Sequence, residues 1–271
     1  MKLAAIIISW DDDIKMLETC VEKLPAAIDG LIIISSETSN FGEKARKWKL
    51  ASWRGTHFYI EPDLKKSPRD NETAKRNFGL DKALELGFTH FLMMDADEFY
   101  DPAEFYKESE RFKNDNLLGL VCRTKVYFRL PTLTIGYDTT LVPFIHKITP
   151  KLRFIWNEQY PFAWTATDGV PFTQNKKIRI DPTRQMNIAS GVEWSEITMH
   201  HYSYIRSDLR KKVRNSTARY NLEKSTIFQD YLEAKEGYYC KFYGKTLESC
   251  QNLFGVPNII DEGLLTPSIT K

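Results

Sequence analysis

The feature that most constrains the fold is a run of four apolar residues, 91–94, that leads directly into three carboxylates: Asp95, Asp97 and Glu98. A continuous apolar run of this kind is typical of a strand buried on both faces of a parallel sheet. Such a strand would end near Met94 and deliver the acids to the carboxyl edge of the sheet. Open α/β sheets bind their ligands at that edge.

The closeness of these carboxylates indicates a cation. Neighbouring carboxylates repel one another and shift each other's pKa values. A divalent metal removes that cost, because hard cations prefer carboxylate oxygens. The alternative is an acidic turn before the helix that begins near Asp101 and Pro102, since acids stabilise a helix N-terminus. The motif alone leaves both interpretations open.

The residues before the acidic strand predict an α/β fold. Apolar runs at 3–9, 31–34 and 56–60 read as buried strands, and helical segments of about 11–24, 42–53 and 72–86 follow them. This alternation, with short connections, predicts a mostly parallel central sheet with right-handed crossovers. Downstream, we expect a charged helix to about residue 114, strands within 118–133 and 141–148, and a helix that begins at about residue 207.

Composition and the absence of certain motifs exclude several classes of protein. The 271 residues carry a net charge of +2, which gives no strongly basic footprint for nucleic acid. The first apolar run is followed by neither Gly-x-Gly-x-x-Gly nor Gly-Lys-Ser/Thr, so the usual glycine-rich phosphate loops are missing. Phosphate charge would instead be met by a metal on Asp97 and by cations such as Lys75, Arg76 or Arg206. With no signal peptide, no stretch of transmembrane length and no metal-type cysteine spacing, we expect a cytoplasmic protein with reduced thiols.

The helix before the acidic strand carries a second indication of a site. Asn77 lies at the end of an inward stripe that continues through Leu80 and Ala83, and Arg76 flanks it. Polar residues beside a strand that ends in carboxylates are expected at a ligand site. The alternative is a hydrogen-bonded core asparagine and a surface arginine, which would be favoured without the neighbouring acids.

Together these features resemble glycosyltransferase family 2, whose members have the GT-A fold. The matching pattern is Ala74-Lys75-Arg76-Asn77 on a helix, a turn at Gly87, an apolar strand and Asp-Ala-Asp at 95–97. The resemblance covers about residues 3–100 well and extends more loosely to about 215. It implies a nucleotide-diphosphate-sugar donor and a manganese or magnesium ion (Mn2+ or Mg2+) that bridges the donor's phosphates.

The resemblance also implies residue roles. Asp95 would contact the ribose or sugar of the donor, and Asp97 would bind the metal. The other donor-site residues that it implies are Ile8, Ser9, Trp10, Ser36, Glu37, Asp63, Lys75, Arg76, Asn77, Ala96 and Arg206. The family usually places an aspartate after the second strand to hold the base, whereas this chain has Ser35-Ser36-Glu37. The identity of the base therefore stays open.

Two carboxylates are candidates for the general base that deprotonates the acceptor, a role that suits a carboxylate in a partly dry site. The stretch 152–159 resembles the family segment that delivers this residue, which here would be Glu158. Asp168 is the competitor, although an aspartate before a glycine is more often a turn residue. Glu193 and Glu196 are the next candidates.

A late pair of histidines supplies further possible ligands. If residues 197–205 form a strand, His200 and His201 face opposite sides. The register of the family favours His201 as a metal or phosphate ligand over His200, and Arg206 as the cation at the diphosphate. The ordinary alternative is a pair of structural histidines. The basic run after Arg206 reads as a solvated face.

From these features we expect a GT-A catalytic domain over residues 1–222, with a nucleotide-sugar-binding half (1–100) and an acceptor half (101–222). Residues 223–271 would form a C-terminal helical and aromatic extension that packs on the core. The expected activity is metal-dependent transfer of a sugar to an acceptor hydroxyl, with inversion. The alternatives are a sugar-phosphate nucleotidyltransferase and a nucleotide-sugar-binding module without turnover. A glycan, a protein, a small molecule and a hydroxymethylated DNA base all remain possible acceptors.

Overall fold

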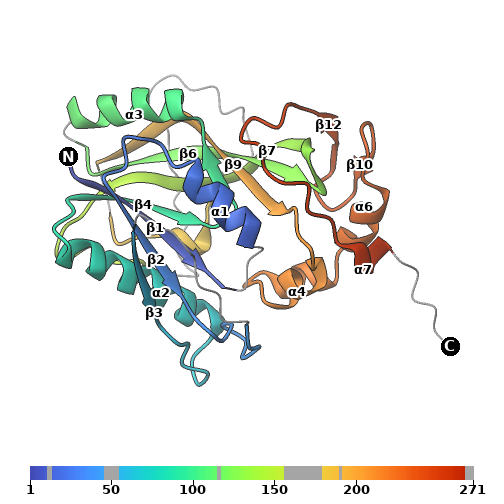
Figure 1. Ribbon diagram of the computed structural model, residues 1–271, viewed down its shortest axis with the longest axis horizontal. Helices are drawn as coiled ribbons and strands as arrows, with labels where there is room; N and C mark the ends of the chain where they lie inside the picture. The colour runs from blue at the N-terminus through green and yellow to red at the C-terminus, as the bar shows by residue number, and fades with distance from the viewer. Residues whose placement is uncertain (11–13, 46–54, 115–116, 156–178, 189–190, 266–271) are drawn as a thin grey trace.

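The computed structural model describes residues 1–10, 14–45, 55–114, 117–155, 179–188 and 191–265. Its main feature is one large sheet with helices on both faces (Figure 1). The strands of this sheet are β1 (Leu3–Ser9), β2 (Gly30–Ser35), β3 (Thr56–Tyr59), β4 (His90–Asp95), β5 (Glu98–Tyr100), β6 (Gly119–Phe128), β7 (Leu130–Lys147), β8 (Arg179–Ile180), β9 (Val192–Tyr204) and β12 (Glu248–Ser249). The helices are α1 (Ile14–Glu22), α2 (Pro68–Glu85), α3 (Pro102–Asn114), η1 (Pro182–Arg184), α4 (Leu209–Arg214), α5 (Arg219–Glu223), α6 (Ile227–Glu233) and α7 (Glu262–Leu265).

The sheet combines a parallel half with a mixed half. Its strands follow the order β3-β2-β1-β4-β7-β6-β9-β5, with β8 and β12 beside β7. The pairs β2–β3, β1–β2 and β1–β4 are parallel, as are β6–β9 and β7–β8. The pairs β4–β7, β6–β7, β5–β9 and β7–β12 are antiparallel. The predicted α/β class with a mostly parallel sheet is therefore confirmed, and every antiparallel pair includes a strand that follows β4.

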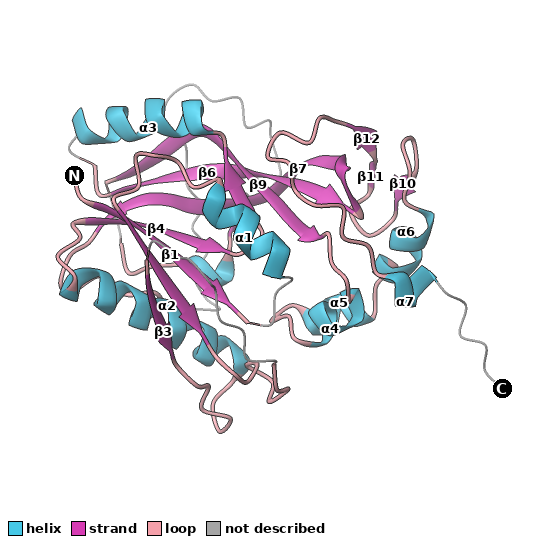
Figure 2. Ribbon diagram, viewed as in Figure 1, coloured by secondary structure: helices cyan, strands magenta, loops and turns pink. Residues whose placement is uncertain are grey.

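Helices bury both faces of the parallel half, which explains why its strands are continuously apolar. Ala4 and Ile6 of β1 pack with Leu80 of α2 on one face. Ala5 and Ile7 lie in the cluster on the other face, which also contains residues of α1 and α3. Because alternate strand residues point to opposite sides, both sets must be apolar. Figure 2 shows α2 and α3 on opposite sides of the strands.

Three predicted elements differ from the structure. Helix α2 begins earlier than expected, because Ser67 and Asp70 form a reciprocal capping box before the apolar stripe starts. The helix predicted over 42–53 lies partly outside the described residues, and residues 42–45 are not helical. The strands predicted within 118–133 and over 141–148 are β6 and one long strand, β7, whose middle at 136–140 is partly exposed and polar. Because this polar middle interrupts the apolar residues of β7, the sequence pattern predicts two strands where there is one.

The last described segment packs against the end of the mixed half. Tyr231 and Leu247 share a buried cluster with Val126 and Phe128 of β6, and β12 pairs with β7. Residues of the tail therefore contact the sheet, while the division into a catalytic domain and an extension after residue 222 stays a prediction. Within the described part of the chain, no helix combines the length and apolar character needed to cross a bilayer.

Candidate active site

The three carboxylates of the acidic strand lie in the turn that joins β4 to β5. Asp95 is the last residue of β4, and Glu98 is the first of β5. The backbone N–H of Asp95 donates to Oε2 of Glu98 at 3.0 Å, which closes the turn. Because β4 runs parallel to β1, the turn lies at the carboxyl edge of the parallel strands, where α/β sheets bind ligands.

Glu98 faces inward, where Arg184 of η1 pairs with it. Arg184 donates from Nη1 to Oε2 of Glu98 at 2.9 Å and from Nη2 to Oε1. Both side chains are only 1% exposed. Burial raises the pKa of the Glu98 carboxyl, although Arg184 acts in the opposite direction. Both oxygens of Glu98 are therefore engaged, and its role in this arrangement is structural.

Asp95 is fixed by two arginines. Nη2 of Arg76 lies 3.3 Å from Oδ1 of Asp95, and Nη2 of Arg184 lies 2.9 Å from Oδ2. Burial opposes ionisation of Asp95, but both arginines outweigh burial and lower the pKa of its carboxyl. The side chain remains 35% exposed and lines a cleft. Asp95 therefore presents a charged and oriented carboxylate to a ligand.

Among the described residues, one oxygen of Asp97 has no hydrogen-bond donor. Its Oδ2 contacts Arg206, and Nζ of Lys212 is 3.7 Å from the same oxygen. Its Oδ1 is buried and accepts no hydrogen bond within the described residues, although Nε2 of His201 is 3.6 Å away. Burial opposes ionisation, but Arg206, Lys212 and His201 outweigh it, and the pKa of Asp97 lies below its usual range.

The two adjacent histidines have different environments. In the β5–β9 pair, His201 lies opposite Glu98, and its side chain is 27% exposed in the cleft. His200 points into the core, where Nδ1 is 2.7 Å from the hydroxyl of Tyr127 and the ring packs on Phe254. Burial lowers the pKa of His200 to about 4. The strand register thus brings His201 to the acids and His200 to the aromatic core.

This arrangement fits a divalent cation. Asp97, Glu98 and His201 offer ligand atoms within 4.8 Å of one another, but Arg184 already engages Glu98. The unpartnered Oδ1 of Asp97 and Nε2 of His201 are the atoms that would hold the ion, and oxygens of a bound ligand would complete its coordination. Because arginines also offset the repulsion between the carboxylates, this repulsion alone does not require a metal.

A cleft of about 860 Å³ opens over these residues. Its walls come from the ends of β1, β4 and β9, from α4 and α5, and from the segment near residue 242. A volume of this size is sufficient for a nucleotide-sized ligand. The cleft is lined by eight of the residues predicted from sequence: Ile8, Ser9, Trp10, Lys75, Asp95, Asp97, His201 and Arg206.

Helix α4 contributes cations that the sequence assigned to a solvated face. Lys211 and Lys212 both line the cleft. Nζ of Lys211 lies 5.3 Å from the centroid of the Trp10 ring, which is within the distance of a cation–π contact. The side chain of Asp208 caps this helix by accepting the N–H of Lys211. The sequence did contain one indication of this role. The helix follows Arg206 closely, which keeps its lysines near the acids.

A lysine occupies the carboxyl end of β2, where the family resemblance implies a base-binding acid. Lys75 is 3% exposed, and its Nζ donates to Oγ of Ser36 at 2.7 Å. Burial lowers the pKa of Lys75 to about 8, while Glu72 and Glu61 act in the opposite direction. This edge of the cleft therefore offers an amine, which the Ser36 hydroxyl holds in place, where the resemblance implies a carboxylate.

Several predicted site residues lie behind the cleft and do not line it. Asn77 accepts the N–H of Phe154 at 2.8 Å and donates to its carbonyl at 3.0 Å, so its amide is engaged in the fold. Asp63 accepts the N–H of Lys65 in the loop before α2. Among the described residues, the predicted ones that do not line the cleft are Ser36, Glu37, Asp63, Arg76, Asn77, Ala96 and His200.

The proposed general bases are not placed by the structure. Glu158 and Asp168 both lie outside the described residues. The further candidates do not line the cleft: Glu196 is 3.6 Å from Lys107, and Glu193 is 3.7 Å from Arg111 of α3. Glu193 and Glu196 are therefore no longer good candidates for the base.

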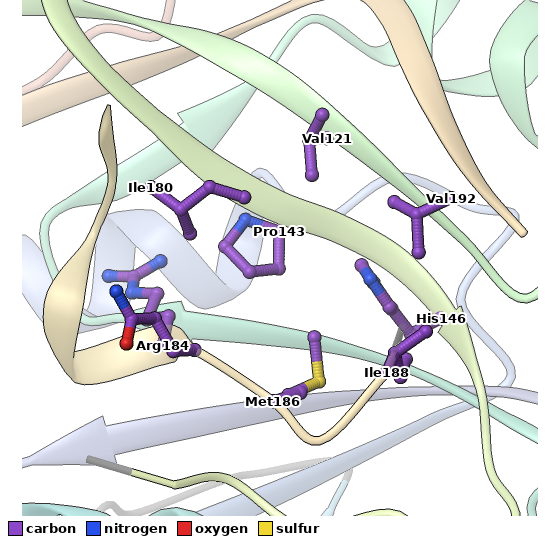
Figure 3. A pocket seen from close by; sticks show the side chains of 9 residues that line it. Val121, Pro143, His146, Ile180, Arg184, Met186, Ile188 and Val192 are labelled. Atoms are coloured by element: carbon purple, nitrogen blue, oxygen red, sulfur yellow. The ribbon is translucent and has the colours of Figure 1, made fainter. Parts of the chain in front are cut away.

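A second cavity lies beside Arg184 and is much smaller. Its volume is about 20 Å³, and its walls include Val121, Pro143 and Ile180 (Figure 3). A space of this size holds about one water molecule. It cannot take a nucleotide, so the larger cleft is the better candidate for the active site.

Part of this chain is similar in structure to several solved proteins. No protein-family model and no curated protein sequence matches it. A crystal structure of S. aureus TarS 1–349 is similar with 10% identity and a TM-score of 0.39, over 79% of this chain and 64% of that chain. A CMP:2-keto-3-deoxy-manno-octonic acid synthetase complexed with CTP is similar with 9% identity and a TM-score of 0.30, over 55% and 72%. The chain spans between 22% and 64% of the length of the TarS chains that it matches.

Proposed function

We propose that this protein is a metal-dependent glycosyltransferase with a GT-A fold. It would move a sugar from a nucleotide-diphosphate-sugar to an acceptor hydroxyl, with inversion at the anomeric carbon. The observation that carries the proposal is a single cleft lined by both acids and cations: Asp95, Asp97, His201, Arg206, Lys211 and Lys212. An available carboxylate oxygen and an imidazole suit a divalent cation, whereas clustered ammonium and guanidinium groups suit a diphosphate.

The reaction exchanges two bonds at the anomeric carbon. The acceptor oxygen forms a bond to this carbon, and its proton passes to a carboxylate, which we propose is Glu158 or Asp168. The bond between the carbon and the diphosphate oxygen breaks, and its electron pair leaves with the nucleoside diphosphate. Arg206, Lys211 and Lys212 favour this step because they neutralise the charge that develops on the diphosphate. A manganese or magnesium ion held by Asp97 and His201 would add charge stabilisation for the leaving diphosphate.

The cleft suggests how the donor lies. Ser9 and Trp10 at the end of β1, with Lys211 over the indole, form an aromatic and cationic wall that suits a nucleotide base and its phosphates. Asp95, which Arg76 and Arg184 hold in place, is oriented to accept hydrogen bonds from the ribose or the sugar. Lys75, whose Nζ donates to Ser36, would contact the nucleoside from the β2 side.

A donor screen tests the proposed function. Thermal unfolding is measured with UDP-, GDP-, CMP- and dTDP-sugars, with and without manganese, because a ligand that binds the folded state raises apparent stability. The proposal predicts that one donor stabilises the protein selectively and that manganese strengthens the effect. Products from that donor then separate the alternatives. Release of nucleoside diphosphate, or of CMP from a CMP-sugar, supports a glycosyltransferase. Formation of nucleoside triphosphate from the donor and added pyrophosphate supports a nucleotidyltransferase, and binding without turnover supports a binding module.

The two histidines should respond differently to removal. His201→Ala should weaken manganese-dependent donor binding by at least about 10-fold, because it removes one of the two side chains proposed to hold the metal. His200→Ala should leave donor affinity close to that of the wild type and lower the free energy of unfolding by about 1–3 kcal/mol, because it removes a core contact with Tyr127. Titration calorimetry and urea unfolding measure the two effects. Equal and negligible effects on donor affinity would return both histidines to a structural role.

The base and the donor site should be separable by mutation. Glu158→Gln keeps the size of the side chain but removes its basicity, so donor binding should change little while transfer falls by about 10²–10⁴-fold. Asp168→Asn is the control and should be milder if Asp168 is only a turn residue. Steady-state transfer rates and donor titrations measure both. A transfer rate near that of the wild type for Glu158→Gln, with an inactive Asp168→Asn variant, would reverse the two roles.

A further inference from the structure

One end of the cleft is formed by the C-terminal segment. Phe242 and Tyr243 line it there, together with Tyr204 of β9 and Asp138 of β7. The hydroxyl of Tyr243 donates to that of Tyr204 at 2.9 Å, and the rings of Phe242 and Tyr243 meet edge to face with centroids 4.8 Å apart. We call these four residues, with their two phenols, one phenyl ring and one carboxylate, the aromatic end of the cleft.

A buried carboxylate holds the aromatic end of the cleft in position. Asp230 of α6 has no exposed surface. It accepts the hydroxyls of Thr226 and Tyr238 at 2.7 and 2.8 Å and the backbone N–H groups of Lys241 and Phe242 at 3.2 and 2.8 Å. Burial opposes its ionisation, but these donors outweigh burial and lower the pKa of Asp230. So many hydrogen bonds to one charge make the turn before Phe242 rigid.

Tyr204 connects the aromatic end to the acids of the proposed donor site. Burial raises the pKa of Tyr204 to about 12, and the charges of Asp138 and Asp97 both add to the shift. Both carboxylates therefore act on the same phenol, and both line the same cleft. A ligand at the aromatic end would lie next to a donor held at Asp97.

We propose that the aromatic end binds the acceptor and that the acceptor is a carbohydrate, an inference that rests on the glycosyltransferase function proposed above. A sugar ring has apolar C–H faces, which pack on aromatic rings, and hydroxyl groups, which donate to carboxylates. Phe242 and Tyr243 supply the first kind of contact, and Asp138 supplies the second. Oδ1 of Asp138 accepts the N–H of Thr139 at 2.6 Å, which orients the carboxylate. An acceptor rich in phosphates fits less well, because Asp138 would repel it.

The test uses the full chain, the donor identified by the screen, and methyl glycosides of glucose, galactose, mannose and N-acetylglucosamine as acceptor probes. At least one glycoside should increase the release of nucleoside diphosphate above the rate of donor hydrolysis. Asp138→Asn and Phe242→Ala should each raise KM for that glycoside by about 10-fold, the effect expected from losing one good contact. The maximal rate should change less than KM, because neither residue is proposed to take part in bond exchange.

A matched control lies on the same segment. Tyr239 is 55% exposed and does not line the cleft, so Tyr239→Ala should keep the KM of the wild type. The dissociation constant of the donor, measured by calorimetry for each variant, shows that the variants fold. If the wild type cleaves the donor but no glycoside accelerates release, the carbohydrate acceptor is wrong while the glycosyltransferase proposal stands. Unchanged KM in both Asp138→Asn and Phe242→Ala would also overturn the inference, whereas a chain that cleaves no donor contradicts the proposed function itself.

Discussion

Asp97→Asn should abolish manganese-dependent donor binding and leave a folded protein. The substitution removes the charge from the oxygen that has no hydrogen-bond donor among the described residues and faces His201. The amide oxygen of asparagine can still accept a hydrogen bond from Arg206, so the local packing is kept. We expect donor affinity in the presence of manganese to fall by at least about 10²-fold, since a direct metal ligand is worth more than the residues that orient it. Titration calorimetry with and without manganese measures the loss.

The control for this variant is another aspartate exchanged for asparagine. Asp81 of α2 is 45% exposed, lies 3.2 Å from Arg153 and does not line the cleft. Asp81→Asn should bind the donor as the wild type does. If Asp97→Asn also retains the affinity of the wild type and its response to manganese, the metal assignment is wrong. A thermal unfolding curve for each variant separates loss of the site from loss of the fold.

The parallel half of the sheet was predictable because its strands are buried on both faces. Ile6 and Ile7 of β1 pack on opposite layers of helices, so the strand appears in the sequence as an unbroken apolar run. β7 gives no such signal, since Tyr137 and Thr139 in its middle are exposed. β7 pairs with β6 and β4 through contacts between strands. The local pattern of apolar and polar residues does not predict these contacts.

The candidate site was predictable in part for a related reason. Asp95 and Asp97 stand out because they follow an apolar run, and strand alternation is sufficient to separate His200 from His201. Arg184 was missed because it meets Glu98 across 86 positions of sequence. Neither periodicity nor local composition links residues so far apart, and an isolated arginine in a loop looks like a surface residue.

Arg184→Met should lower the free energy of unfolding by about 3–5 kcal/mol, the cost of leaving a buried charge without its partner. Arg184 is 1% exposed and pairs with Glu98, which is also 1% exposed, and with Asp95. Methionine fills a similar volume, so the loss would come mainly from the unpaired carboxylates and much less from a cavity. Urea unfolding monitored by tryptophan fluorescence gives the free energy directly.

The partner substitutions show whether the unpaired charge is the cause. Glu98→Gln should cost only about 1–2 kcal/mol, because the amide can still accept a hydrogen bond from Arg184, which keeps Asp95 as its ionic partner. Combining Arg184→Met with Glu98→Leu should recover part of the stability lost in Arg184→Met alone, since it removes both members of the buried pair. A double variant less stable than Arg184→Met would show instead that shape, and not charge, holds the turn between β4 and β5. The same turn carries Asp95 and Asp97, so donor affinity should fall together with stability in Arg184→Met. In the double variant, donor affinity should recover only in part, because Asp95 still lacks one of its two arginines.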